Sequence, residues 1–455
     1  MGTSMGTSGI DWSTLASNSQ SSSSAGFSVS TIVNEVIQSQ RSTGETEWQT
    51  EETNFTNQSS ALTQLGTQLQ SLLTSVHALG DATGSLNART TSVSDSDVLS
   101  ASASAGAAVG NHSITVTSLA STASFYSNEL ASSSTTFTAG TLSIQVGSGT
   151  ATSITVDSTD NTLAGLADAI NNQKLGVDAS VVTDAGGARL MLVSQASGAA
   201  GNITITSNTT GLTLNRGATG ADAALTVDGV PVDSASNSVT VNGLTLNLLG
   251  RSSSPVTVQV APDTSQAASA INSFVSAYNT IVSSLNSQFS YNAGAGSGGA
   301  LMGDAAAEMV QSTLLGDVST SLSSNGAIST LADLGVTMGD DGTLTVDSSK
   351  LTGALTSNFQ SAATFFQTAS TGFAQKFASD LTNLTDPTNG PINIDLQGVK
   401  ASISSLQSQI ADFEANLVTE KQSLMTYYSN INTTLQSLPT LLSSVNSQLA
   451  SLKSS

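Results

Sequence analysis

The chain has 455 residues, of which 38% are apolar and only 9% are charged, with 11 lysines and arginines against 32 aspartates and glutamates. This apolar content is enough for packed cores, so the chain is not wholly disordered, and its length is typical of about three domains. A net charge of -21 disfavours nucleic acid and anionic membranes as partners, because binding to phosphates requires a basic surface. The absence of cysteine excludes disulfides, thiol catalysis and cysteine-ligated metals.

Residues 1–25 form a segment rich in serine, glycine and threonine that contains no lysine or arginine. The segment has neither the basic start nor the apolar run of a Sec signal peptide. We therefore expect a disordered N-terminal tail. No stretch of the chain approaches the ~18 consecutive apolar residues that a membrane span requires, so we expect no membrane insertion.

Residues 26–90 carry the spacing of amphipathic helices and are predicted to be N-terminal leg helices. After a polar gap at Thr43 and Gly44, apolar residues recur at every seventh position, which is typical of a helix packed along another helix. The glycines at Gly80 and Gly84 are expected to end this helix. The sevenfold series comprises Trp48, Phe55, Leu62, Leu69 and Val76.

Between residues 91 and 262 the pattern changes to short alternating runs of apolar and polar residues, as in half-buried strands. Asp228-Gly229 and Asn242-Gly243 stand between apolar runs, where tight hairpin turns require positive φ at both central residues. One helix, in the stretch from Thr162 to Asn171, interrupts the strands. The region is therefore predicted to be β-rich.

We expect this β-rich region to form two head domains, one inserted into the other. The inner head domain is expected to comprise residues 91–120 and 206–262, and the outer head domain residues 121–205. Helical spacing returns in residues 263–390, which are predicted to rejoin the leg as several helices with a small hairpin at Asp341-Gly342.

Residues 391–455 are predicted to form one long heptad helix, which must have a partner helix. Its seam has the same period as that of residues 26–90, so we expect the two chain ends to pack side by side, parallel or antiparallel. Pro439 removes a helical hydrogen bond, which predicts a kink or a restart after Leu438. The sevenfold series comprises Leu396, Ile403, Ile410, Leu417, Leu424, Ile431 and Leu438, and continues to Val445 and Leu452.

The expected fold class is α+β and multidomain, with terminal helices in a coiled-coil-like leg bundle and β-rich head domains inserted between them. Intramolecular packing is the simplest use of the two seams. Their length exceeds what one small core needs, so we also expect the seam residues from Trp48 to Val76 and from Leu396 to Leu438 to take part in assembly.

No constellation of catalytic or metal-ligating residues stands out. The two histidines, His77 and His112, have no second histidine, cysteine or carboxylate at ligand spacing and are expected to be structural. The stretch GAGSGG from Gly294 to Gly299 fits G-x-G-x-x-G but follows an amphipathic helix instead of a strand, so it is interpreted as a flexible loop. The aspartates around Asp341 lack the spacing of a calcium loop. We expect no enzymatic activity, no cofactor and no metal.

Six stretches of the chain, taken in order, match one known family. They are GFSVSTIVNEVIQSQ at 26–40, TLAGLADAINNQKLGVDASVVTDAGGARLMLVSQASGAAGNITI at 162–205, ADAALTVDGVPVDSASNSVTVNGLTLNL at 221–248, AINSFVSAYNTIV at 270–282, LGVTMGDDGTLTVDSSKL at 334–351 and SLQSQIADFEANLVTEKQSL at 405–424. The chain resembles the flagellar filament cap proteins, also called hook-associated protein 2, along nearly its whole length. The second stretch is similar to the IN motif of flagellin and hook-associated proteins, which places that motif in the outer head domain.

The resemblance implies a structural protein that the flagellar type III system exports, with the N-terminal tail as export signal, to the distal tip of the filament outside the cell. It implies a homo-oligomeric ring, commonly a pentamer, that promotes folding and polymerisation of exported flagellin and prevents its leakage. The implied partners are further copies of the chain, flagellin, hook-filament junction proteins and a flagellar export chaperone, and the implied second role is adhesion. On the residues alone, a secreted surface adhesin or fibre with a β-rich head on a helical stalk is the alternative.

Overall fold

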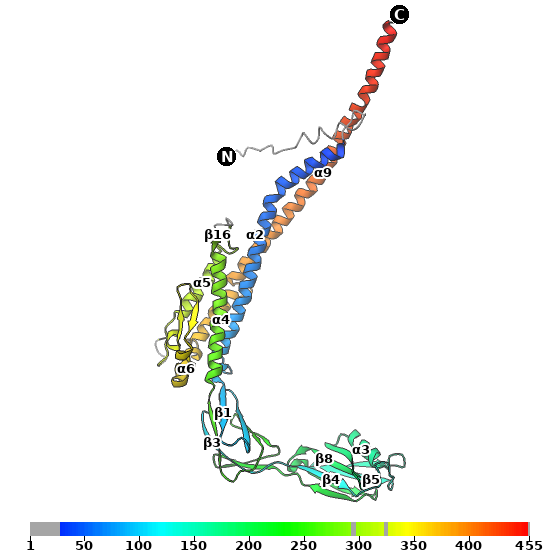
Figure 1. Ribbon diagram of the computed structural model, residues 1–455, viewed down its shortest axis with the longest axis vertical. Helices are drawn as coiled ribbons and strands as arrows, with labels where there is room; N and C mark the ends of the chain where they lie inside the picture. Colours follow the sequence, from blue (N-terminus) through cyan, green and yellow to red (C-terminus); the bar gives the residue numbers. More distant parts are fainter. Residues whose placement is uncertain (1–27, 293–296, 323–325, 454–455) are drawn as a thin grey trace.

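The computed structural model describes residues 28–292, 297–322 and 326–453, and it shows a long helical leg with β-rich domains at one end (Figure 1). The chain runs down the leg, passes through the β-rich region and returns along the leg. The predicted combination of terminal helices with a β-rich insertion is therefore confirmed. The tail expected at residues 1–25 lies outside the described residues.

Two long helices, α2 (Val29–Gly80) and α9 (Pro391–Lys453), form the length of the leg and run antiparallel. Contacts at two levels fix their register. Gly66 of α2 lies beside Ile392 near the start of α9, whereas Gln40 donates a hydrogen bond of 3.0 Å to Glu420 farther along α9. Of the two orientations that the heptads allow, the chain therefore adopts the antiparallel one.

The expected gap in the N-terminal helix at Thr43 and Gly44 is wrong, because α2 continues through it as one helix. The Thr43 hydroxyl donates to the carbonyl oxygen of Ser39 at 2.9 Å, so this polar side chain is satisfied within the helix. Gly44 faces the ring of Phe413 so closely that a Cβ added there would lie 2.5 Å from Cζ of the ring. The same ring packs edge-on against Trp48, with the ring centroids 5.5 Å apart. The glycine thus permits the close approach of α2 and α9.

Of the kink or restart expected after Leu438, the restart is wrong, because α9 contains Pro439 within one continuous helix. Proline removes one backbone donor and leaves a carbonyl of the preceding turn without its helical partner. The side chains from Ser437 to Thr440 are exposed. Water can therefore solvate the carbonyl there, which lowers the cost of keeping proline inside the helix.

Shorter elements thicken the half of the leg nearest the heads. Helices α4 (Thr264–Phe289) and α8 (Phe373–Thr385) pack directly on α2. The predicted hairpin at Asp341-Gly342 is confirmed, with Val336 opposite Val346 and a φ of 79° at Gly342. The other elements are η2 (Ser85–Asn87), β16 (Tyr291–Asn292), β17 (Ser297–Gly298), α5 (Ala305–Val318), η4 (Leu331–Leu334), β18 (Val336–Met338), β19 (Leu344–Val346), α6 (Ser348–Ser357) and α7 (Phe359–Gln367).

Five buried phenylalanines from three helices form the centre of the leg core. The ring of Phe373 lies in the middle of this group, with ring centroids 5.7 Å from Phe274 of α4 and 5.4 Å from Phe365 of α7. Phe377 lies one turn later on α8, also 5.4 Å from Phe373. Such edge-to-face and offset contacts stabilise a core beyond the area they bury. The fifth ring is Phe366.

The inner head begins where the leg ends, and its two antiparallel sheets share one apolar core. The two predicted hairpin turns are confirmed: Asp228 and Asn242 have φ of 54° and 50°, and the glycines that follow them have φ of 82° and 81°. One sheet has the order β1 (Arg89–Val93), β15 (Val256–Pro262), β3 (Gly110–Ser118), β11 (Ala223–Val227) and β12 (Val230–Ser234). The other has the order β13 (Ser238–Val241), β14 (Leu244–Leu248) and β2 (Leu99–Ala103).

The outer head has a separate core between two further sheets and the helix α3 (Leu163–Asn172), the helix predicted from the sequence. A 3-10 turn, η3 (Ala199–Gly201), joins β8 to β9. One sheet has the order β10 (Leu214–Ala218), β4 (Thr122–Ser127), β8 (Ala188–Ser197) and β7 (Val177–Thr183). The other has the order β6 (Thr152–Val156), β5 (Gly140–Val146) and β9 (Ile203–Asn208).

The position of residues 206–218 differs from the expected division, which assigned them to the inner head. Strand β9 runs on to Asn208 along β5, and β10 pairs with β4 from Leu214 to Ala218, so these residues belong with the outer sheets. Alternation of apolar and polar residues predicts a strand but does not identify the strand that it pairs with. The boundary therefore depended on tertiary pairing.

Two helical glycines should respond in opposite ways to replacement by alanine. Gly398 of α9 has no atom within 4 Å of an added Cβ, so Gly398→Ala should stabilise the protein by about 0.5–1 kcal/mol. At Gly44 the same change places a methyl group against Phe413, so Gly44→Ala should lose that gain and alter the fluorescence of Trp48. Urea unfolding of both variants tests this, and an equal gain in both would contradict the close packing at Gly44.

Removal of the central ring of the leg core should destabilise the leg strongly. Phe373 is 3% exposed, and Phe373→Ala should lower the free energy of unfolding by about 3–5 kcal/mol. Tyr291 is 59% exposed and provides the matched control, since Tyr291→Ala should change the free energy by less than about 0.5 kcal/mol. Both values come from urea unfolding followed by far-UV circular dichroism. A small effect at Phe373 would show that the aromatic cluster is dispensable.

Candidate assembly surface along the leg

The predicted seam residues nearest the heads lie inside the leg. Leu62, Leu69 and Val76 are fully buried in the leg core, with relative exposure of 0%. Apolar side chains at these levels meet several helices at once, because α4 and α8 join α2 and α9 there. Three more seam residues are half-buried against this core, namely Phe55, Leu396 and Ile403.

Farther from the heads only α2 and α9 remain, and the seam becomes narrower. Leu417 is buried in a small cluster with Val33 and Ile37, and Leu424 packs half-buried against that cluster. The seam residues Trp48, Ile410 and Ile431 are half-buried as well. A two-helix contact covers only one side of each helix, which explains why so few residues are fully buried.

Polar contacts join α2 to α9 in this narrow part of the leg, and the sequence patterns did not predict them. Nε and Nη2 of Arg41 both donate to Glu414, the second at 2.6 Å, and Gln407 donates to Glu52 at 2.7 Å. Glu45 is only 6% exposed and lies beside the same ion pair. The sequence held one indication of an ion pair here, because Arg41 is the one lysine or arginine within α2.

The pKa values of the two carboxyl groups beside Arg41 shift in opposite directions. Hydrogen bonds from Arg41 lower the pKa of Glu414, because they favour its charged form. The neighbouring Glu414 carboxyl, together with burial, raises the pKa of Glu45. The α2–α9 contact thus holds one ionised carboxyl and one that prefers to keep its proton.

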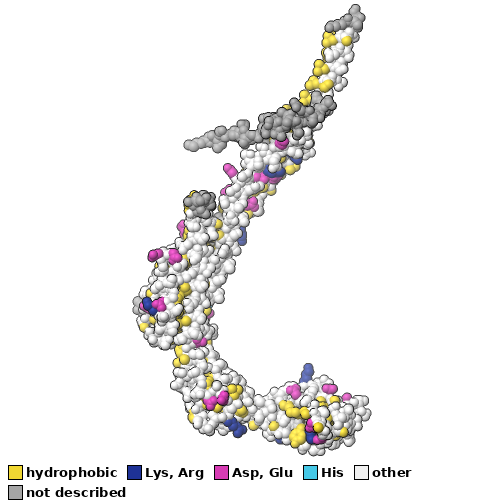
Figure 2. Space-filling view, viewed as in Figure 1, with side chains coloured by type: hydrophobic (Ala, Val, Ile, Leu, Met, Phe, Trp, Pro, Cys, Tyr) yellow, Lys and Arg dark blue, Asp and Glu magenta, His cyan; other side chains and the backbone are white. Residues whose placement is uncertain are grey.

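Near its C-terminal end α9 presents an apolar surface that the described part of α2 does not reach. We call Leu438, Leu442, Val445 and Leu449 the distal stripe; their spacings of four, three and four residues place them on one helix face. Their side chains are 45%, 62%, 50% and 52% exposed. Residues 431–452 contain no charged side chain, and Figure 2 shows hydrophobic side chains gathered on this end of α9.

The expectation that both histidines lack a carboxylate neighbour is wrong. His77 lies 3.5 Å from Asp81, one turn later at the end of α2, and Nδ1 of His112 lies 2.8 Å from Asp228. The hairpin between β11 and β12 brings Asp228 to β3, and the hydrogen bond from His112 lowers the pKa of the Asp228 carboxyl. The His112 contact holds β3 to this hairpin, whereas the His77 contact is local to the end of α2. Across the described ranges, no group of three or more acidic, histidine or cysteine side chains could hold a metal.

Two further expectations concern loops and membranes. Of the glycine-rich loop, Gly294 and its neighbours at 293–296 lie outside the described residues. Oδ1 of Asp341 accepts hydrogen bonds from the amide and hydroxyl of Thr343, which lower the pKa of Asp341 and fix the hairpin turn. Among the helices that the structure describes, none combines the length and the apolar content needed to span a bilayer.

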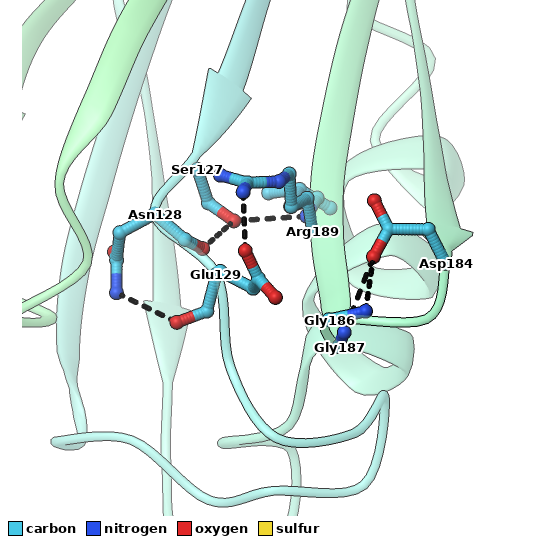
Figure 3. Close-up of polar contacts among 8 residues, drawn as sticks. Ser127, Asn128, Glu129, Asp184, Gly186, Gly187 and Arg189 are labelled. Atoms are coloured by element: carbon cyan, nitrogen blue, oxygen red, sulfur yellow. Dashed lines mark hydrogen bonds and ion pairs between the residues drawn. The ribbon is translucent and has the colours of Figure 1, made fainter.

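The polar cluster at one end of the outer head is a structural clasp (Figure 3). Arg189 of β8 forms an ion pair with Glu129, which follows β4, and so ties two neighbouring strands together. Oδ1 of Asp184 accepts hydrogen bonds of 2.8 Å and 3.2 Å from the amides of Gly186 and Gly187, which closes the turn between β7 and β8. The polar groups of the cluster are hydrogen-bond or ion-pair partners of one another, so the cluster orders the edge of this sheet.

Comparison with family models matches both the leg and the heads. Residues 25–123 match the N-terminus of flagellar hook-associated protein 2, and residues 220–440 match its C-terminus. Residues 141–196 match the flagellin hook IN motif, which lies in the outer head. The matched segments follow the order in which the leg, the heads and the leg again appear along the chain.

Individual relatives cover most of the chain. The B-type flagellar hook-associated protein 2 of Pseudomonas aeruginosa is 30% identical over 429 residues, which span 87% of this chain and 90% of that protein. Flagellar hook-associated protein 2 of Escherichia coli K12 is 28% identical over 436 residues, which span 86% and 89%. The crystal structure of the D1-D2-D3 domains of the flagellar cap protein FliD from Escherichia coli has a TM-score of 0.62 and 28% identity, and covers 75% of this chain and 99% of that chain.

The family models and the relatives agree with the architecture. The leg helices and the inner head lie within the segments matched to the two ends of one family, and the solved cap protein shares the arrangement of leg and heads. The chain therefore belongs to the flagellar hook-associated protein 2 family, the family of flagellar filament cap proteins.

Proposed function

We propose that this chain caps the distal end of a bacterial flagellar filament as a ring of identical copies that guides exported flagellin into place and prevents its leakage. The similarity over leg and heads to a solved flagellar cap protein is the observation that carries the proposal. A narrow leg with broad heads at one end suits this task. The heads can form a plate while the legs reach down to the filament subunits.

In this proposal the distal stripe of α9 is the part of the seam that contacts the filament. Most seam residues nearer the heads are buried or half-buried within the chain, so they position the leg, whereas the stripe is about half exposed. Four apolar residues on one face of an uncharged helix suit another amphipathic helix as partner. Terminal helices of flagellin or of hook-filament junction proteins would supply such a face.

We assign the contacts between ring subunits to the heads. The outward face of the sheet formed by β10, β4, β8 and β7 carries Tyr126, Val182 and Met191, which are 41%, 49% and 37% exposed. Tyr126 and Met191 are opposite each other on neighbouring strands, so they form one apolar surface. A neighbouring head of the ring is the proposed partner of this face, and a pentamer is the proposed stoichiometry.

Export and further partners complete the proposal. The chain would leave the cell through the flagellar type III system, with the serine-rich segment at residues 1–25 as its export signal and a flagellar chaperone bound before export. A second role in adhesion is part of the family resemblance. The described residues contain no feature that favours a particular receptor.

Charge on the distal stripe should abolish filament capping without unfolding the protein. Leu442→Glu with Val445→Glu introduces two carboxylates into the proposed apolar contact, and burial of unpaired charge is costly. Cells that carry this variant should lose motility and release monomeric flagellin into the medium. Flagellin in the culture supernatant and swimming in soft agar are the measurements.

Ser444 lies on the polar side of the same helix, and Ser444→Glu is the matched control that should keep motility. Circular dichroism of the purified variants verifies that both fold. An adhesin would behave differently, since filaments and swimming would survive changes on the stripe while surface attachment changed. Full motility of the Leu442 and Val445 variant would therefore refute the proposed filament contact.

A charge on the outer sheet should break the ring. The wild-type protein should form an oligomer with five times the 45.6 kDa mass of the chain, and Met191→Glu should shift it to monomers by at least about tenfold in dissociation constant. Ser158→Glu, in an exposed turn of the same domain, should leave the oligomer intact. Light scattering after size-exclusion chromatography measures the masses, and an unchanged Met191 variant would place the subunit contact elsewhere.

A further inference from the structure

Three pairs of acidic side chains lie at contacts between different segments of the leg. Each pair places two carboxyl groups beside each other, and two ionised carboxylates have no proton with which to form a hydrogen bond. In each pair, one buried oxygen receives no hydrogen bond from a described donor. We call them the leg carboxyl pairs: Glu45 with Glu414, Asp304 with Asp395, and Asp317 with Asp380.

The first pair lies between α2 and α9 in the narrow part of the leg. Oε2 of Glu45 accepts a hydrogen bond of 2.9 Å from Gln49, whereas its buried Oε1 has no described donor. Glu414 lies across the helix contact and is already held by Arg41. Arg41 and Glu414 are the charged groups that face Glu45. A proton on Glu45 would supply the missing hydrogen bond to Glu414.

The second pair lies where three segments of the leg meet. Asp304 is 7% exposed and caps α5, with Oδ1 accepting from the amide of Ala307 at 2.9 Å and Oδ2 accepting from Gln58 of α2 at 3.0 Å. Asp395, in the first turns of α9, faces Asp304, and its buried Oδ2 has no described donor. Asp304 is the charged group that acts on Asp395, and the neighbouring side chain from α2 is the neutral Gln58.

The third pair joins α5 to α8. The side chain of Asp317 is 9% exposed, and its Oδ2 is buried without a described donor. Asp380 of α8 faces it, and Nζ of Lys376 lies 3.8 Å from Oδ1. Helices α4 and α9 also pack on α5: Tyr278 is the one titratable side chain of α4, and Asp395 of α9 faces Asp304 at the start of α5. The single distant lysine does not neutralise two carboxylates at a buried contact.

We propose that the leg is a proton-linked bundle, in which each leg carboxyl pair holds one proton between two segments and the release of these protons loosens the contacts. The physical reason is the repulsion between two adjacent carboxylates, which a shared proton replaces with a hydrogen bond. All three pairs act on contacts within the leg, since the first links α2 to α9, the second links the start of α5 to α9, and the third links α5 to α8. The three pairs lie in the leg, so the stability of the heads should not depend on their protonation.

The titration of the pairs gives the direction of the effect. Burial, with the Asp380 charge as a second cause, raises the pKa of Asp317 to about 7, and burial with the neighbouring Asp304 carboxyl raises the pKa of Asp395 to about 6. The pKa of Glu45 is raised as well. A carboxyl group whose pKa is higher in the folded state than in the unfolded state stabilises the folded protein while it is protonated. This stabilisation is complete at pH values below the unfolded-state pKa, which is about 4 for aspartate. This stabilisation is lost as the pH rises through 6 to 7.

Neutral replacements of the same shape test the proposal on the full chain. Asp317→Asn and Asp395→Asn remove the charge and supply an amide donor to the partner carboxyl. Each should raise the melting temperature at pH 8 by about 3–8 °C and leave it nearly unchanged at pH 5.5. Asp233→Asn in the inner head, whose carboxyl is exposed, is the matched control and should shift neither value.

Protonation of any of its carboxylates can stabilise a chain of net charge -21, so the pH dependence of the wild-type protein alone does not test the proposal. The test is the difference in pH dependence between the neutral variants and the wild type. Trp48, beside the first pair, reports local loosening once Trp12→Phe has removed the second tryptophan. Its fluorescence should change as Glu45 titrates, and Glu45→Gln should suppress the change. The proposal is overturned if the neutral variants follow the wild-type pH dependence, or if they are destabilised equally at both pH values.

Discussion

The antiparallel packing of α2 against α9 is the interaction on which the rest of the structure depends. It joins positions as far apart in sequence as Glu52 and Gln407, which are separated by 355 residues. Everything between the two helices is an insertion into this contact. The entropy of closing such a loop grows only with the logarithm of its length, so the buried leucines of the leg and its aromatic core can offset it.

The leg changes character along its length, and each part suits a different task. Near the heads, several helices surround an apolar core, which makes this part stiff. Farther from the heads, two helices share a thin seam, and the polar groups of Arg41, Glu45 and Glu414 add to its small apolar cluster. At the end, the distal stripe leaves apolar surface exposed. A cap that must hold its own shape and also contact filament subunits needs both kinds of surface.

The heads meet the leg through a short joint of two neighbouring backbone segments. The amide of Asp263 donates to the carbonyl of Ala88 at 3.0 Å, and the ladder of β1 with β15 starts at the next pair, Arg89 opposite Pro262. Gln367 of α7 reinforces the joint by accepting from Asn87 at 3.0 Å. Forces on the heads would pass to the leg through these two backbone segments and the hydrogen bonds between them.

The sequence by itself determined the elements and the family: the heptad series predicted two long helices, Asp228-Gly229 and Asn242-Gly243 predicted their hairpins, and the matching stretches predicted the cap family. These signals are local, because helix period and turn geometry depend on neighbouring residues. Only the tertiary structure decided the antiparallel orientation, the sheet that β10 joins, and the pairing of Glu45 with Glu414. Each depends on residues far apart in sequence, and the same periodicity is compatible with several partners.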